Sequence, residues 1–322
     1  MNTTIRQQQW QDKSLKLSCI VPVHNEAQAI VEFLTQLNDE LKLHSNDYEI
    51  IAVDDGSHDE SLANMEALIA SMPLKIIGLS RNFGKEKALT AGLEHCSGDA
   101  TILIDSDFQH PFTSIKTFVE NWVQGYDMVY GVRTSRKGEG FIKKAFSRLF
   151  YKLTHKLNEV PIPKDAGDFR LLDRAVVDAL TNCHERNRFM KGLYAWVGFK
   201  SLAVPFEVQD RTHGQSSWSF SRLFSLALDG IFSFSNAPLR MWTFVGLIIS
   251  LIAFFYGLWI VFSTLYYGVD TPGFATIIVA VMFLGGIQLL SIGILGEYIG
   301  RIFTEVKHRP NYIIAKKIGF ND

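Results

Sequence analysis

The sequence predicts an α/β domain with a parallel sheet, followed by a hairpin of two transmembrane helices. Two observations carry this prediction. Up to Gly131, short apolar runs alternate with segments of helical periodicity, and this alternation is typical of parallel strands joined by crossover helices. Residues 242–267 and 274–296 contain no charged side chain, and each run is long enough to cross about 30 Å of hydrocarbon.

The alternating pattern predicts the elements of the first domain. The expected strands are residues 17–23, 48–53, 74–79, 100–104 and 128–131, and the expected helices are residues 27–43, 85–95 and 114–124. Polar side chains follow three of these strands directly. Ligands of open α/β sheets bind at the carboxyl ends of the strands. We therefore expect the functional site at that edge of the sheet.

Two amphipathic segments separate this pattern from the apolar runs. In residues 142–157, Ile, Phe and Leu recur at helical spacing while Lys and Arg occupy other faces. The pattern is typical of a helix on anionic lipid, although a solvated helix packed on the domain also shows it. Residues 218–234 form a second amphipathic segment that leads toward the first apolar run. Proximity to the apolar runs favours the lipid surface.

Charged residues around the apolar runs predict their orientation. The loop between the runs contains Asp270 and no Lys or Arg. Basic residues flank the runs at Arg240, Arg301, Lys307 and Arg309. The positive-inside rule places both termini in the cytoplasm. Buried core helices are the alternative, and two long uncharged runs in close succession make that alternative the weaker one.

Composition narrows the classes of partner. With Lys+Arg 32 and Asp+Glu 33, the net charge is -1, so gross electrostatics give no support for a nucleic-acid partner. Cys19, Cys96 and Cys183 are an odd, scattered set, which argues against a disulfide framework or a zinc site. Residues 1–14 are polar and lack the pattern of a signal peptide. We therefore expect the first domain in the cytosol.

A candidate metal site follows the fourth expected strand. Asp105 and Asp107 come directly after a buried apolar run, and Gln109 continues the alternation. On extended backbone, alternate side chains project to the same side, and hard divalent cations prefer oxygen ligands. The pattern therefore predicts Mg²⁺ or Mn²⁺ bridging the two phosphates of a nucleotide. A solvated loop or a helix cap is the alternative interpretation.

Polar residues after the first two strands predict the rest of a nucleotide pocket. Pro22, Asn25 and Glu26 end the first strand, and Asp54 and Asp55 end the second. A carboxylate there can accept a hydrogen bond from a ribose hydroxyl or a base N–H, although helix capping would also explain it. No GxGxxG follows the first strand and no GxxxxGKS occurs. Dinucleotide and P-loop sites therefore lack their phosphate cradle.

Seven motifs in a fixed order carry a family resemblance. They are the first strand with Pro22 and Asn25-Glu26, Asp54-Asp55-Gly56-Ser57, Arg81-Asn82-Phe83-Gly84-Lys85, Asp105-Ser106-Asp107, and residues 167–172, 185–192 and 295–301. The chain resembles the family 2 glycosyltransferases, which have a GT-A (Rossmann-like) α/β fold. Within them it is similar to the polyprenyl-phosphate glycosyltransferases, close to the bactoprenol glucosyltransferases and more distantly to dolichyl-phosphate mannose synthase. The resemblance covers nearly the whole chain after about the first fifteen residues.

The resemblance implies roles for the candidate residues. Asp54 would contact the donor nucleoside, within a donor-binding set completed by Pro22, Asn25, Glu26, Asp55, Lys85 and Asp105. The metal would be held by Asp105, Asp107 and Gln109. Arg133 and Arg211 would meet phosphate groups, which suits their guanidinium geometry. Asp168 is the remaining acid-base candidate, and we expect it to position substrate, since a phosphate nucleophile needs no strong base.

The implied reaction transfers a hexose, glucose by the resemblance, from a UDP-sugar to undecaprenyl phosphate with inversion. The resemblance also implies a multi-pass protein of the bacterial inner membrane that supplies lipid-linked sugar for O-antigen or other envelope glycans. We expect a cytoplasmic catalytic domain over residues 1–213, an amphipathic juxtamembrane segment over 214–241, the spans within 242–296 and a basic cytoplasmic tail over 297–322.

Alternative functions remain, and the sequence departs from the family pattern at one position. A polymerising synthase is disfavoured because only two spans are expected and no Gln-x-x-Arg-Trp stretch occurs. A membrane scaffold that binds nucleotide sugar without turnover, or a bare two-span anchor, leaves the ordered polar strand ends unexplained. Relatives often have Gly-x-Ser-Lys where this chain has Ser217-Trp218. Gly285-Gly286 and Gly293 would allow close helix packing, so a homo-oligomer is possible.

Overall fold

The computed structural model describes residues 3–134, 166–186, 188–207, 237–267 and 273–320. Within these residues, eight strands form one sheet in the order β7-β5-β6-β4-β1-β2-β3-β8. The strands are β1 (Lys16–Val23), β2 (Asp47–Asp54), β3 (Leu74–Leu79), β4 (Ala100–Leu103), β5 (Met128–Arg133), β6 (Ala166–Asp173), β7 (Ser201–Phe206) and β8 (Ile314–Ile318). All five strands predicted from the sequence are present, with ends that differ by a few residues.

The sheet is parallel at its centre and mixed at its sides. Strand β1 pairs in parallel with β2 and β4, and β2 pairs in parallel with β3. Strands β6 and β8 run antiparallel to their neighbours. Both faces of the central strands are buried, which explains their continuous apolar runs in place of alternation.

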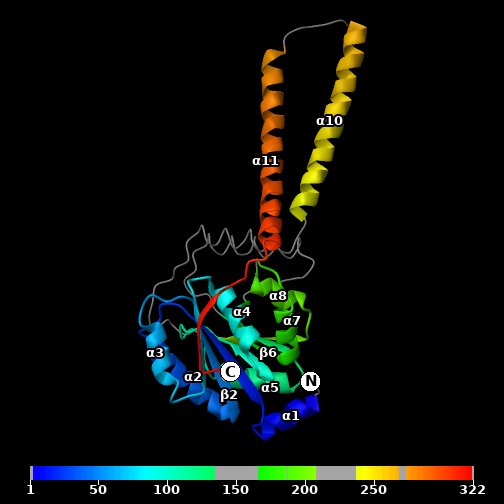
Figure 1. Cartoon of the computed structure of the whole chain (residues 1–322). Helices are drawn as coiled ribbons and strands as arrows, with labels where there is room; N and C mark the ends of the chain where they lie inside the picture. The colour runs from blue at the N-terminus through cyan, green and yellow to red at the C-terminus, as the bar shows by residue number, and fades with distance from the viewer. Residues whose placement is uncertain (1–2, 135–165, 187, 208–236, 268–272, 321–322) are drawn as a thin grey trace.

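Helices cover the two faces of the sheet (Figure 1). The helices of the domain are α1 (Thr3–Gln11), α2 (Ile30–His44), α3 (Ser61–Leu68), α4 (Lys85–His95), α5 (Ser114–Val123), α7 (Arg174–Thr181) and α8 (Met190–Trp196). Phe33 of α2 and Phe118 of α5 belong to the core on one face. Leu89 of α4, Val177 of α7 and Leu193 of α8 belong to the core on the other. The predicted α/β fold is therefore confirmed.

The N-terminal segment docks onto the domain through one buried arginine. Arg6 of α1 is 1% exposed, and its Nη2 donates at 2.8 Å to both Asp127 Oδ1 and Asp173 Oδ2. Its Nη1 donates to the carbonyl oxygens of Trp122 and Tyr126. A buried charge is stable only with such partners. This helix was not predicted, because residues 1–14 are mainly polar.

Two long helices project from the domain side by side, α10 (Ala237–Tyr267) and α11 (Phe274–Val306) (Figure 1). Among the described residues, Ala280–Val306 of α11 is long and apolar enough to cross a membrane, with mean hydropathy 1.7, and its apolar window is not buried in the protein. Helix α10 holds a shorter apolar stretch, Phe244–Trp259. The amphipathic segments predicted at 142–157 and 218–234 lie outside the described residues.

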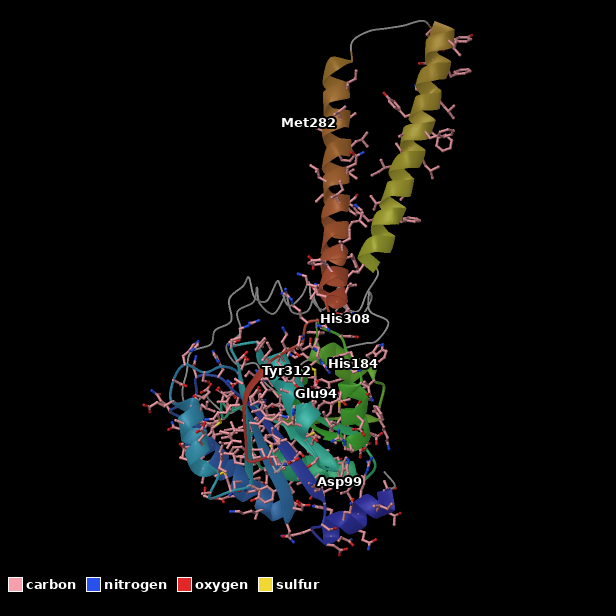
Figure 2. The ribbon with its side chains drawn as sticks, viewed as in Figure 1. Glu94, Asp99, His184, Met282, His308 and Tyr312 are labelled. Carbon is pink, nitrogen blue, oxygen red and sulfur yellow. The ribbon has the colours of Figure 1, made fainter. Side chains whose placement is uncertain are left out.

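Residues 297–322, expected as a basic cytoplasmic tail, continue α11 and then rejoin the sheet. Helix α11 extends to Val306, ten residues beyond the predicted end of the span, and Glu297 pairs with Arg301 one turn later. After the helix, β8 adds antiparallel to β3. Tyr312, labelled beside Glu94 in Figure 2, donates a hydrogen bond to the Glu94 carboxylate. The C-terminal segment is therefore part of the domain.

Replacing Arg6 with Met tests the docking of α1. The substitution leaves Asp173, which is 2% exposed, without its cationic partner. Breaking a buried pair from one side costs about 3–5 kcal/mol, and we expect that loss in the free energy of unfolding of the full chain in detergent. Lys42→Met, at a side chain that is 54% exposed, should change it by less than about 0.5 kcal/mol. Equal effects of the two substitutions would contradict the assignment.

Candidate functional site

The candidate site lies where β4 ends and β6 begins. The antiparallel pairing of β4 with β6 sets Leu103 opposite Arg170. Asp105, just after β4, and Asp168, near the start of β6, therefore reach the same edge of the sheet. Strand β6 was not predicted as an element, so the sequence did not bring these two carboxylates together. The sheet topology does.

A single lysine joins the two carboxylates. Lys85, the first residue of α4, places its Nζ 2.7 Å from Asp105 Oδ1 and 2.7 Å from Asp168 Oδ2. Partial burial acts to lower the pKa of Lys85, but Asp105 and then Asp168 outweigh it and raise the pKa above its ordinary value. Lys85 was predicted as a donor-binding residue; its bridge to both carboxylates was not predicted.

Asp168 is held as an anion in this cluster. Burial acts to raise the pKa of Asp168, but Lys85, Lys191 and Arg170 outweigh it and keep the pKa well below its usual range. The direct ion-pair partner of Asp168 is Lys85. The Arg170 guanidinium lies over the Tyr194 ring at 3.5 Å and donates to the Gly167 carbonyl. An anion of such low pKa suits positioning better than proton transfer.

The backbone at Asp105–Gln109 differs from the expectation. Strand β4 ends at Leu103, and the chain then turns, with Phe108 at φ 58°. The prediction of extended backbone through Gln109 is wrong, because Asp107 Oδ1 accepts the Gln109 N–H at 3.1 Å and closes the turn. Phe108 packs against Phe33 of α2, with ring centroids 5.2 Å apart. The turn, and not strand alternation, places these side chains.

Asp105 and Asp107 nevertheless act on one neighbour. His110 is 3% exposed, and its ring lies 4.8 Å from that of Phe169. Burial lowers the pKa of His110, while Asp105 and then Asp107 oppose that shift. The charges of both carboxylates therefore act on the same imidazole. His110 was not singled out from the sequence, since nothing there showed that it would be buried beside two carboxylates.

The residues expected to hold a metal offer oxygen donors only. Arg133, at the end of β5, donates from Nη2 to Gln109 Oε1 at 3.5 Å. Within the described ranges, no three His, Cys, Asp or Glu side chains gather into a metal site; the expected set has two carboxylates and one amide. Oxygen donors suit Mg²⁺ or Mn²⁺, and a cationic group already contacts Asp105. The set fits a hard divalent cation. Arg211 lies outside the described residues.

Asp55 holds the loop before α4 in place. Its two carboxylate oxygens accept the N–H groups of Phe83, at 2.7 Å, and Gly84, at 2.9 Å. Burial raises the pKa of Asp55, and these two N–H groups oppose the shift. Gly56 is required beside it, because its φ is 65° and an added Cβ would lie 2.4 Å from the Arg81 carbonyl carbon. Asp55 therefore positions the loop that carries Lys85.

The other expected donor-binding residues gather at the same edge. Asp54 is 3% exposed and accepts the Ser57 N–H at 3.3 Å. Asn25 adopts φ 55° and accepts the His58 N–H at 2.9 Å. The N–H of Glu26 donates to Ser61 Oγ at 2.8 Å. The Pro22 carbonyl accepts a hydrogen bond from Ser106 Oγ at 3.4 Å, which joins β1 to the turn after β4.

Comparisons with known proteins agree on the class of enzyme. The profile of glycosyl transferase family 2 matches residues 18–181, and that of the GtrB C-terminal hairpin matches residues 237–302. A prophage-derived bactoprenol glucosyl transferase of Shigella flexneri is 44% identical, over 94% of this chain and 98% of its own length. A putative glycosyltransferase of Bacillus subtilis, CsbB, is 44% identical over 93% of this chain and 91% of its own.

Replacing Asp55 with Asn tests its positioning role. An amide has one acceptor oxygen, so one of the Phe83 and Gly84 N–H groups would lose its partner. We expect a loss of about 1–3 kcal/mol in the free energy of unfolding, with faster hydrogen exchange at those two amides. Asp39→Asn, at a carboxylate that is 67% exposed, is the control and should leave both amides protected. Unchanged exchange at Phe83 and Gly84 in the Asp55 variant would refute the role.

Proposed function

The chain belongs to glycosyl transferase family 2, and from that premise we propose that it transfers a hexose from a UDP-sugar to a polyprenyl phosphate of the undecaprenyl type. The observation that carries the proposal is the Lys85–Asp105–Asp168 cluster, which stands at the carboxyl edge of the sheet close to the base of α11. The relatives named bactoprenol glucosyl transferases support glucose as the sugar and bactoprenol as the lipid.

The donor would bind along the ends of β1, β2 and β4. Asp54 would accept a hydrogen bond from the nucleoside, beside the turn formed by Pro22, Asn25 and Glu26. Asp105, Asp107 and Gln109 would hold Mg²⁺ or Mn²⁺, which when bound neutralises charge on the departing diphosphate. Support for this assignment is the all-oxygen donor set, which suits a hard divalent cation.

The acceptor phosphate would attack the anomeric carbon directly, with inversion. Its second pKa is about 6, so it is largely deprotonated at neutral pH and needs no strong general base. Asp168 would stay ionised and keep Lys85 in place, consistent with its lowered pKa. Arg133 and Arg211 would contact phosphate oxygens of the donor or acceptor through their planar guanidinium groups.

A membrane hairpin would hold the enzyme beside its acceptor. Helix α11 has the length and apolarity of a span, and the match to the GtrB C-terminal hairpin covers both long helices. We propose a multi-pass protein of the bacterial inner membrane with the domain and both termini in the cytoplasm. Confinement to one surface raises the local concentration of a lipid acceptor. The product would supply O-antigen or other envelope glycans.

Replacing Asp107 with Ala tests the donor site. We expect transfer of labelled glucose from UDP-glucose to undecaprenyl phosphate to fall by at least about 100-fold, since a charged group that acts in the transition state is lost. Membrane insertion should be unchanged, because Asp107 lies in a turn of the domain. Asp59→Ala, outside the proposed metal set, is the control and should retain most of the transfer. Undiminished transfer by Asp107→Ala would overturn the assignment.

Removal of divalent cations tests the proposed metal separately. EDTA should abolish formation of the lipid-linked sugar by the wild-type chain, because the leaving diphosphate would lose its neutralising ion. Excess Mg²⁺ or Mn²⁺ should restore it. Full activity in EDTA, with no metal detected in the purified protein, would show that Lys85 and the arginines neutralise the diphosphate alone.

A further inference from the structure

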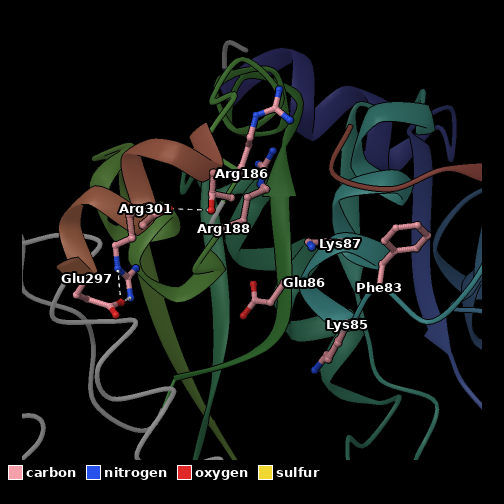
Figure 3. A pocket seen from close by; sticks show the side chains of 11 residues that line it. Phe83, Lys85, Glu86, Lys87, Arg186, Arg188, Glu297 and Arg301 are labelled. Atoms are coloured by element: carbon pink, nitrogen blue, oxygen red, sulfur yellow. Dashed lines mark hydrogen bonds and ion pairs between the residues drawn. The ribbon is translucent and has the colours of Figure 1, made fainter. Parts of the chain in front are cut away.

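A cavity of about 520 Å³ lies between the start of α4 and the base of α11. Its walls come from three parts of the chain that are distant in sequence: residues 83–87, residues 186 and 188, and residues 297–304 of α11. Figure 3 shows Glu86 and Lys87 on one side of the space and Glu297 and Arg301 on the other. Of the residues expected to bind the donor, Lys85 lines this cavity, whereas Pro22, Asn25, Glu26, Asp54, Asp55 and Asp105 do not.

Basic side chains outnumber acidic ones in the lining of the cavity, and two of the basic side chains have no ion-pair partner among the described residues. It is lined by Lys85, Lys87, Arg186, Arg188 and Arg301 against the acids Glu86 and Glu297. Arg301 pairs with Glu297 at 3.0 Å, and Arg188 donates to the Leu180 and Cys183 carbonyls. Within the part of the chain that the structure describes, the side chains of Lys87 and Arg186 have no carboxylate partner, and Arg186 Nη1 is buried without a hydrogen bond. They are left to bind an anion.

The carboxyl group of Glu86, which also lines the cavity, opposes an anion only weakly. Glu86 accepts the Met190 N–H at 2.8 Å. Burial and then Asp168 raise the pKa of Glu86 to about 7, so much of it is neutral near pH 7. The backbone also favours an anion, because α4 begins here and the N–H groups at a helix N-terminus carry partial positive charge. Gly84 leaves open space, with no atom within 4 Å of an added Cβ.

We propose that this cavity binds the phosphate headgroup of the lipid acceptor, with Lys87 and Arg186 as its ligands. The inference rests on the proposed function, and it assigns the acceptor phosphate a binding site separate from that of the donor. Lys85 lines the cavity and also contacts Asp105 and Asp168, so a phosphate held here would lie next to the donor site. The third wall is the base of the apolar helix α11, where the headgroup of a membrane lipid is expected.

Kinetics with the full-length enzyme in mixed micelles test this assignment. The variants are Lys87→Gln, Arg186→Gln and the double variant, assayed with undecaprenyl phosphate and UDP-glucose. Hydrogen bonds to charged groups contribute about 1.5–3 kcal/mol each, so each single variant should raise the KM for undecaprenyl phosphate about tenfold or more. The KM for UDP-glucose should not change. Lys116→Gln, on α5 and 65% exposed, is the matched control and should leave both constants unaltered.

The possible outcomes separate the sources of the phosphate. An unchanged acceptor KM in the double variant would overturn the site, as would an equal rise in the KM for UDP-glucose. Micelles of phosphatidylglycerol provide a second arm. If phosphatidylglycerol inhibits the wild type but not the double variant, and undecaprenyl phosphate binds both equally, the cavity holds a bilayer headgroup and the acceptor assignment is wrong.

Equilibrium binding of radiolabelled undecaprenyl phosphate separates this inference from the proposed function. Weaker binding by the double variant than by the wild type and Lys116→Gln would support the site even without turnover. If the wild type binds the lipid but forms no lipid-linked sugar, the proposed function fails while the site stands. If the wild type forms the product and the double variant binds the lipid as well as the wild type, the site fails alone.

Discussion

The contact of the Lys85 ammonium with Asp105 and Asp168 is the interaction on which the rest of the site depends. It joins the start of α4, the turn after β4 and the beginning of β6. Two carboxylates this close repel each other unless a cation lies between them. The lysine therefore permits both to be ionised at one edge of the sheet. It also marks the boundary between the donor side of the site and the cavity beneath α11.

The position of Lys85 depends in turn on Asp55. The carboxylate of Asp55 fixes the N–H groups of Phe83 and Gly84, and α4 begins at the next residue. Gly56 allows the two loops to approach, since a larger residue would collide with the backbone of Arg81. Asp55, which the sequence assigned to nucleotide contact, thus shapes the loop that carries Lys85, the cation of the candidate site. The two roles are compatible, because they use the same strand end.

The long helices are tied to the domain at their base. Helix α11 is followed by β8, which completes the sheet beside β3, and Tyr312 and Lys316 contact Glu94 and Glu66. The N–H of Arg186 donates to Glu305 of α11 at 3.2 Å. These contacts keep the apolar helix and the sheet edge in a fixed relation. The proposed lipid acceptor and nucleotide-sugar donor would therefore meet at one place.

The sequence by itself determined the central strands, the helices α2, α4 and α5, the two long apolar helices and the candidate residues at the strand ends, whereas α3 was not predicted. These features are local, since hydrophobic periodicity and the polar residues at strand ends depend only on residues that are close in sequence. Tertiary structure alone decided which of those residues meet. Antiparallel pairing brings Asp168 to Asp105, a turn replaces the expected extended backbone at Asp107, and burial gives Arg6 its role. Such contacts join residues far apart in the chain, and their free energy depends on packing that no single segment encodes.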